Sequence, residues 1–150
     1  MAGGQELVVV GVDGSAGSVA ALAWAARYAS GTGARVRALL AWHYPGAVGG
    51  PPMEKAPESV RSETEQHEQA ILDEAVAKAC PGQEPGVETS IGYGHPTQVL
   101  IDASKEADLL VVGSRGHGAW AGMLVGSVSI HCITGAFCPV VVVRGAHDRH

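Results

Sequence analysis

The chain has 150 residues, of which 46% are hydrophobic and 17% are charged. This length predicts a single domain with a substantial core over residues 1–150, and the composition argues against disorder. The formal net charge of −5 argues against nucleic acid and anionic membrane surfaces as partners, while it leaves room for a local basic site that binds a nucleotide.

The sequence shows no sign of export or of membrane insertion. Residues 1–6 carry no basic segment before the first apolar run, and no apolar run is long enough to span a bilayer. Cys80, Cys132 and Cys138 lack the spacing of a metal site, and we interpret them as small buried side chains in a reducing compartment. We therefore expect a cytoplasmic protein.

The N-terminal part of the chain alternates between strand and helix patterns. Residues 6–12 form an apolar, β-branched run, which predicts a buried strand. Ser15 or Ser18 can cap a following helix, which the stretch 30–33 brings to an end. Residues 34–42 predict a second strand. This spacing of strand, helix and strand indicates a right-handed parallel crossover.

Residues 43–57 differ from the rest of the chain, because their prolines and glycines prevent regular structure. A loop of this length is uncommon in a compact domain, and such loops tend to be functional or disordered. We expect it near the mouth of a ligand cleft as a partial lid, and a mobile connector without a role is the alternative. Residues 145–150 predict a flexible tail.

The remaining sequence continues the alternation of helices and strands. Residues 58–80 predict a long amphipathic helix. Its expected apolar stripe consists of Val60, His67, Ile71, Leu72, Ala75, Val76 and Ala79. Later strands are expected at 87–92, 108–112 and 139–144, and later helices after a capping or cleft-edge His95 and over 127–136. Five strands alternating with helices predict an α/β fold with an open, doubly wound parallel sheet and helices on both faces, for which geometry allows several strand orders.

The pattern most indicative of function lies between the fourth and fifth expected strands. The fourth strand stops at Gly113, Gly116 follows, and Gly126 and Ser127 open a helix. Glycines lack Cβ and can adopt positive φ, so the loop backbone can approach a polyphosphate and point successive N–H groups at it. The helix N-terminus adds unpaired amides and the positive end of its dipole. Taken alone, the glycines fit a surface loop with an ordinary serine cap equally well.

Polar side chains in this region extend the same interpretation. Ser127 and Ser129 offer hydroxyls to phosphate oxygens or to a Mg²⁺ shell, and either can instead cap the helix. Arg115 provides a cation within the loop, with a solvent-facing position as the alternative. The sequence lacks G-x4-G-K-[ST] and G-x-G-x-x-G, which argues against a P-loop ATPase and a dinucleotide oxidoreductase.

Two separate parts of the chain resemble the universal stress protein family. The family's nucleotide-binding signature, G-x2-G-x9-G-[ST], is complete at Gly113, Gly116, Gly126 and Ser127. The segment 8–15, VVVGVDGS, is similar to the family's first strand and loop. The resemblance covers nearly the whole chain. It implies a Rossmann-like fold, related to the adenine nucleotide α-hydrolases, with strand order 3-2-1-4-5.

In this order, the loops after the first and fourth strands meet where the strand order reverses, which is where such sheets bind ligands. There, the Asp13 carboxylate can accept a hydrogen bond from a ribose hydroxyl, an adenine amine or a metal-bound water, or it can stabilise the turn itself. The resemblance favours contact with the ligand. The implied nucleotide-binding residues are Gly11, Val12, Asp13, Ala41, Gly113, Ser114, Arg115, Gly116, Gly126, Ser127, Val128 and Ser129.

The resemblance implies an ATP-binding regulator or sensor of the stress response, with ATP as the cofactor and Mg²⁺ as an accompanying ion reached through Asp13. A slow Mg-dependent ATPase and a ligand-free interaction module are the alternatives. No residue is evidently placed as a general base, so we predict no catalytic residues and at most weak hydrolysis. The family's habit also implies an antiparallel homodimer through the valine-rich edge strand 140–144, unless residues 146–150 shield that edge.

Overall fold

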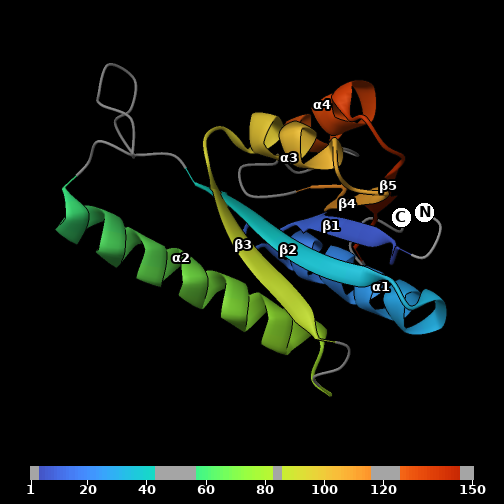
Figure 1. Ribbon diagram of the computed structural model, residues 1–150, viewed down its shortest axis with the longest axis horizontal. Coiled ribbons are helices and arrows are strands. Elements are labelled where there is room, and N and C mark those ends of the chain that lie inside the picture. The colour runs from blue at the N-terminus through green and yellow to red at the C-terminus, as the bar shows by residue number, and fades with distance from the viewer. Residues whose placement is uncertain (1–3, 43–56, 83–85, 116–125, 146–150) are drawn as a thin grey trace.

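The computed structural model describes residues 4–42, 57–82, 86–115 and 126–145. Its five parallel strands form one sheet with the order β3-β2-β1-β4-β5 (Figure 1). The strands are β1 Leu7–Gly11, β2 Arg35–Trp42, β3 Val87–Tyr93, β4 Leu109–Gly113 and β5 Val140–Val143. The parallel sheet and the order implied by the resemblance are therefore confirmed.

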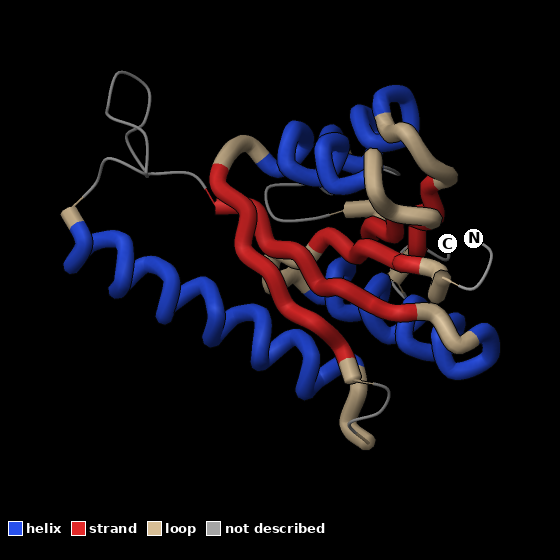
Figure 2. The backbone as a smooth tube through the Cα atoms, in the orientation of Figure 1, coloured by secondary structure: helices blue, strands red, loops and turns tan. Residues whose placement is uncertain are grey.

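Helices cover both faces of the sheet, as Figures 1 and 2 show. One face carries α1 and α2, and the other carries α3 and α4. The helices are α1 Ala16–Thr32, α2 Glu58–Ala79, α3 Pro96–Ser104 and α4 Ser127–Gly135. Successive residues of the central strand divide between two cores, since Val8 and Val10 pack towards α1 and α2 while Leu7 and Val9 pack towards α3 and α4. Coverage on both faces explains why the central strands are continuous apolar runs.

The ends of α1 are set by a serine and a glycine. Of the two serines predicted as caps, Ser15 is the N-cap, and its hydroxyl accepts the N–H of Ser18 at 3.2 Å. Gly33 ends the helix with φ +79° and donates its N–H to the carbonyl of Ala29. The helix thus runs through Gly31 and Thr32, past the first of the predicted stop residues, because the left-handed conformation that stops it occurs only at Gly33.

The buried stripe of α2 differs from the predicted one at a single position. Glu68, Leu72 and Ala75 are buried, whereas His67, predicted to face inward, is exposed. Positions 68, 72 and 75 follow the i, i+4, i+7 spacing of one helix face, and His67 lies about 100° around the helix from Glu68. The buried residue is therefore a carboxylic acid, and its burial raises the pKa of Glu68 above its ordinary value of 4.5.

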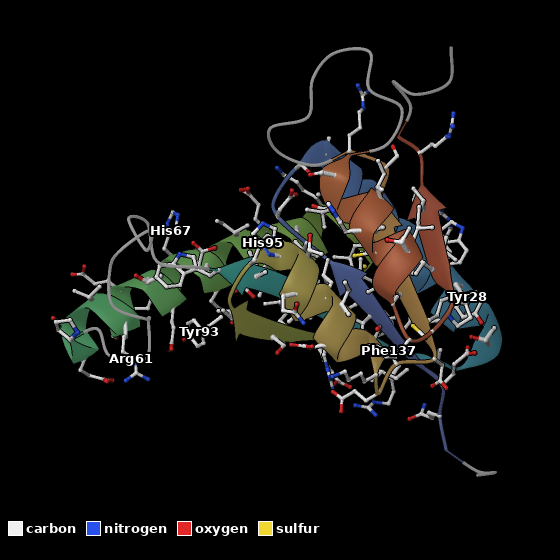
Figure 3. The ribbon with its side chains drawn as sticks, turned by 90° about the horizontal axis from the view of Figure 1, so that it is seen from above. Tyr28, Arg61, His67, Tyr93, His95 and Phe137 are labelled. Atoms are coloured by element: carbon white, nitrogen blue, oxygen red, sulfur yellow. The ribbon has the colours of Figure 1, made fainter. Side chains whose placement is uncertain are left out.

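The third helix begins with a histidine cap, as predicted. Figure 3 shows His95 next to α3. Its Nδ1 atom accepts the N–H of Thr97 at 3.2 Å, and Pro96 occupies the first helical turn. Among the described residues, no helix is both long and apolar enough to cross a membrane. The predicted loop 43–57 and tail 145–150 lie outside the described residues, apart from Pro57 and Gly145.

Candidate functional site

A cavity of about 290 Å³ opens at the carboxyl ends of β1 and β4, on the side of the sheet that carries α3 and α4. It is lined by Gly11, Val12, Asp13, Ser15, Ser18, Leu39, Ala41, Pro96, Leu100, Val112, Gly113, Arg115, Gly126, Ser127, Val128 and Ser129. The two sequence segments that pointed to a nucleotide, after β1 and after β4, therefore meet in one cavity.

Most of the residues predicted from the sequence line this cavity, and two need comment. Ser114 is buried, with 1% of its surface exposed, and is not among the lining residues. Its backbone instead links the end of β4 to β5 and to the start of α4. The N–H of Ser114 donates to the carbonyl of Val143 at 2.9 Å, and its carbonyl accepts the N–H of Gly126 at 2.5 Å. Gly116 lies outside the described residues.

Six lining residues were missed from the sequence: Ser15, Ser18, Leu39, Pro96, Leu100 and Val112. Strand alternation gives a signal for Leu39, which lies on the same face of β2 as Ala41. Helical spacing gives a signal for Leu100, which lies one turn after Pro96. Nothing in the local pattern of α3 places it over β1, because that contact depends on how the helix packs.

The apolar part of the cavity is built from β2, β4 and α3. Leu39, Leu100 and Val112 belong to the core beneath α3 and α4, and Ala41 and Pro96 extend the same wall. Gly11 lets Leu100 approach, since a Cβ at Gly11 would lie 2.9 Å from the Leu100 Cδ1 atom. Apolar walls of this kind suit a flat aromatic ring.

The polar part begins at the turn between β1 and α1. The Asp13 carboxylate accepts the N–H of Ser15 through Oδ1 at 2.9 Å, which is the turn role considered for it. The Ser18 hydroxyl accepts the N–H of Asp13 at 3.3 Å and donates to the Ser15 carbonyl at 3.0 Å. Gly14, with φ +86°, allows the backbone to make this tight turn. Asp13 is exposed at the cavity while its backbone and carboxylate are both held by serines.

The N-terminus of α4 supplies the other polar wall. Gly126 is the N-cap and contributes no side-chain cap, so neither Ser127 nor Ser129 has the capping role considered for it. The Ser129 hydroxyl donates to the Gly113 carbonyl at 2.5 Å and is buried, whereas Ser127 is exposed at the cavity. The two hydroxyls thus differ: that of Ser129 joins α4 to β4, and that of Ser127 is exposed at the cavity.

Gly113 is required for a reason that the sequence did not reveal. It does not adopt a positive φ; the glycines that do in the described residues are Gly14, Gly33 and Gly94. A Cβ on Gly113 would instead lie 2.7 Å from the carbonyl oxygen of Gly17 in the first turn of α1. Of the two properties of glycine considered from the sequence, the lack of a Cβ is therefore the one that matters at Gly113, and backbone packing is the constraint.

Asp13 and Arg115 are the charged side chains that line the cavity. The described residues contain no group of three or more histidines, cysteines and carboxylates placed to hold a metal. One carboxylate with a neighbouring hydroxyl fits Mg²⁺ only when the ligand's own phosphates complete the coordination, which is the usual manner of Mg²⁺ binding.

The chain is similar to known proteins over nearly its whole length. The sequence model of the universal stress protein family matches residues 6–144. A universal stress protein of Mycolicibacterium smegmatis is 39% identical over 94% of this chain and 50% of its own length. The chain spans about half the length of the curated relatives it matches.

Solved structures show the same fold. A universal stress protein in complex with cAMP superimposes with a TM-score of 0.65 at 29% identity, covering 92% of this chain and 95% of that one. The protein UspA from Lactobacillus plantarum superimposes with a TM-score of 0.72 at 24% identity, covering 93% and 97% of the two chains.

Proposed function

Because the chain belongs to the universal stress protein family, we propose that the cavity between β1 and β4 binds an adenine nucleotide and that nucleotide occupancy regulates a stress response. The observation that carries this proposal is that the Asp13 turn meets three of the signature residues, Gly113, Gly126 and Ser127, in one cavity. The cAMP complex of a structural relative at 29% identity supports an adenine nucleotide as the ligand.

The proposed binding mode assigns the two ends of the cavity to the two ends of the nucleotide. The base lies against Leu39, Ala41 and Leu100, and the phosphates face Ser127 and the N-terminus of α4. Of the remaining predicted residues, Gly11 and Val12 flank the base, and Arg115, Gly126 and Val128 border the phosphates. Within this mode the ligand is ATP accompanied by Mg²⁺, with Asp13 as the protein's contribution to the ion.

The arrangement favours binding over turnover. Among the described residues that line the cavity, Asp13 is the one carboxylate, and none is a lysine that could stabilise a leaving diphosphate. The function is therefore that of a sensor or regulator, with at most weak ATP hydrolysis. A phosphate-release assay with purified protein and ATP tests this directly, and turnover typical of an ATPase would contradict it.

Binding is tested by calorimetric titration of nucleotide-free protein with ATP and Mg²⁺, where we expect a micromolar Kd, about −8 kcal/mol. The informative variant is Ala41→Leu, which fills the apolar end of the cavity and should abolish binding without unfolding the protein. Ala70→Leu, on the exposed face of α2, is the matched control and should bind normally. Absence of heat and of any thermal shift with every adenine nucleotide would overturn the proposal.

We also propose that two copies associate through β5. This strand lies at the edge of the sheet, and its four valines, Val140–Val143, are partly exposed. On one side, β5 contacts α1, whose stacked rings of Trp24 and Tyr28 are partly exposed and pack against the same core as Val141 and Val143. An antiparallel homodimer covers both the unpaired backbone and this apolar surface.

Two broader assignments complete the proposal. Residues 1–150 act as one domain, because all described strands belong to one sheet. The protein works in the cytoplasm, where the free thiols of Cys80, Cys132 and Cys138 stay reduced. Immunoblotting of fractionated cells tests the location.

A further inference from the structure

The start of α4 is joined by hydrogen bonds to the edge strand of the sheet. Gly126 and Ser127, at the N-terminus of α4, line the cavity. The N–H of Gly126 donates to the carbonyl of Ser114 at 2.5 Å. The N–H of Ser114 donates in turn to the carbonyl of Val143, the last residue of β5, at 2.9 Å. One residue of backbone therefore links the cavity end of α4 to β5.

One flank of α4 is apolar and exposed. Ile130 and Ile133 have 48% and 53% of their surface exposed. On the other flank, Gly135 faces α3, because a Cβ on it would lie 2.9 Å from an α3 side chain. With about 100° of rotation per residue, both isoleucines lie about 140–160° around the helix from Gly135. The flank that carries them therefore points away from α3.

This flank lies over the open edge of the sheet. The α3 helix contacts β1, β2 and β4, whereas α4 contacts β5, and the two helices lie side by side (Figure 1). Val140 and Val142 of β5 are partly exposed and pack on the same face of the sheet as α4. Ile130, Ile133, Val140 and Val142 therefore form one surface, which we call the α4–β5 surface.

We propose that the α4–β5 surface holds a second copy of this chain, and that nucleotide binding and this association strengthen each other. The inference rests on the proposed function, for both the nucleotide site and the pairing of β5. A partner must present an open strand edge beside an apolar helix flank, and a second copy presents both. Antiparallel pairing of two β5 strands gives a two-fold axis perpendicular to the sheet, so the two α4 helices lie on the same face with these flanks towards each other.

The coupling follows from how α4 is held. The helix has nine residues, of which Ser129 and Cys132 are buried, and its N-cap Gly126 makes no side-chain hydrogen bond. A helix of this length is not stable by itself, so its position depends on its contacts. A nucleotide phosphate at its N-terminus and a second copy against its flank both hold it in place. Whichever binds first therefore reduces the ordering that the other must impose.

Sedimentation equilibrium of nucleotide-free protein, with and without ATP and Mg²⁺, measures the coupling. We expect ATP with Mg²⁺ to tighten the dimer about fivefold or more. By reciprocity, calorimetric titration should show tighter ATP binding at protein concentrations at which the dimer forms than at concentrations at which the chain is monomeric.

Two variants separate the interface from damage to α4. Ile130→Gln/Ile133→Gln, at half-exposed positions, should weaken the dimer about tenfold or more and bind ATP like the dilute unchanged chain. Val142→Pro removes an N–H that β5 directs to the open edge and leaves the sequence of α4 unchanged, so it should bind ATP with that same affinity. Tyr93→Gln, at an exposed position on the opposite edge strand β3, is the control and should dimerise normally.

The outcomes distinguish the inference from the proposed function. A dimer that is equally tight in Ile130→Gln/Ile133→Gln overturns the α4–β5 surface. A dimer Kd that ATP leaves unchanged, although titration shows that ATP binds, overturns the coupling and leaves the nucleotide site intact. A chain that stays monomeric with bound ATP overturns the whole inference and, again, leaves the nucleotide site intact. Absence of ATP binding at every protein concentration means that the proposed function fails, and the coupling falls with it.

Discussion

Gly113 at the end of β4 and Gly17 in the first turn of α1 lie in direct backbone contact. A Cβ on Gly113 would come within 2.7 Å of the Gly17 carbonyl oxygen, and a Cβ on Gly17 within 2.4 Å of the Arg115 carbonyl oxygen. Neither clash is with a flexible side chain, so backbone would have to move. The first glycine of the nucleotide-binding signature therefore holds the loop against α1, whether or not a nucleotide is bound.

This contact predicts that Gly113→Ala destabilises the ligand-free protein, by about 1–3 kcal/mol as expected for overpacking. Gly31→Ala is the matched control, since Gly31 lies in α1 with open space around the added Cβ, and it should stabilise by about 0.5–1 kcal/mol. Urea unfolding without nucleotide measures both. Equal stability of Gly113→Ala and the unchanged chain would contradict the packing role. Loss of nucleotide binding in Gly113→Ala does not by itself identify a phosphate contact.

The two serines at the start of α4 should separate stability from binding. Ser129→Ala removes the buried hydroxyl that donates to the Gly113 carbonyl, and we expect it to cost about 1–3 kcal/mol of stability. Ser127→Ala removes an exposed hydroxyl at the cavity and should weaken nucleotide binding with stability nearly unchanged. Paired urea unfolding and titration test this, and interchanged behaviour of the two variants would show that the assignment is reversed.

Glu68 predicts a pH-dependent effect on stability. Desolvation raises the pKa of its carboxyl above 4.5 in the folded state, and the charge of neighbouring His67 opposes the shift. The folded protein therefore binds this proton more tightly than the unfolded chain does. The stability that this proton contributes is fully present below pH 4.5 and is lost as the pH rises through the pKa of the folded state. Glu68→Gln should therefore gain stability relative to the unchanged chain at neutral pH and little at pH 4.

Urea unfolding at several pH values measures this difference. The control is Glu63→Gln, an exposed carboxyl on the same helix, for which we expect no comparable gain. A gain for Glu68→Gln that is equally large at pH 4 would mean that the carboxyl is not the titrating group.

Cys132 should be inert in the folded protein. It is fully buried in α4, and burial raises the pKa of its thiol to about 11. The thiolate is the reactive form, so at pH 8 iodoacetamide should modify this residue only after unfolding. Peptide mass spectrometry of protein labelled with and without denaturant reads out the result. Rapid labelling of Cys132 in the folded protein would show that α4 opens.

The proposed dimer can be tested through the hydrogen-bonding direction of β5. The carbonyls of Pro139 and Val143 accept from β4, so by strand alternation the N–H and carbonyl of Val142 point to the open edge. Val142→Pro should therefore block strand pairing with a second copy while keeping the hydrogen bonds to β4. We expect a dimer for the unchanged chain and for Val142→Ala, and a monomer for Val142→Pro, in sedimentation equilibrium. A monomeric unchanged chain at micromolar concentration would contradict the dimer.

The sequence allowed the elements of this fold to be predicted, because each depends on local physics. Apolar runs such as residues 7–10 indicate strands that are covered on both faces, and Ser15, Gly33 and His95 mark helix ends through their own hydrogen bonds or backbone conformation. The spacing of Gly113, Gly126 and Ser127 likewise indicated one side of the cavity. The strand order came from the family resemblance, since parallel crossovers of similar length are compatible with several orders.

Only the tertiary structure decided which residues distant in sequence contact one another and which of them line the cavity. It placed Leu39, Pro96 and Leu100 in the cavity, turned the Ser129 hydroxyl towards Gly113, and buried Glu68 in place of His67. These outcomes depend on the rotation and position of each helix against the sheet. Sequence periodicity is a local signal that identifies a face of an element, whereas the packing of two elements fixes which atoms of that face meet.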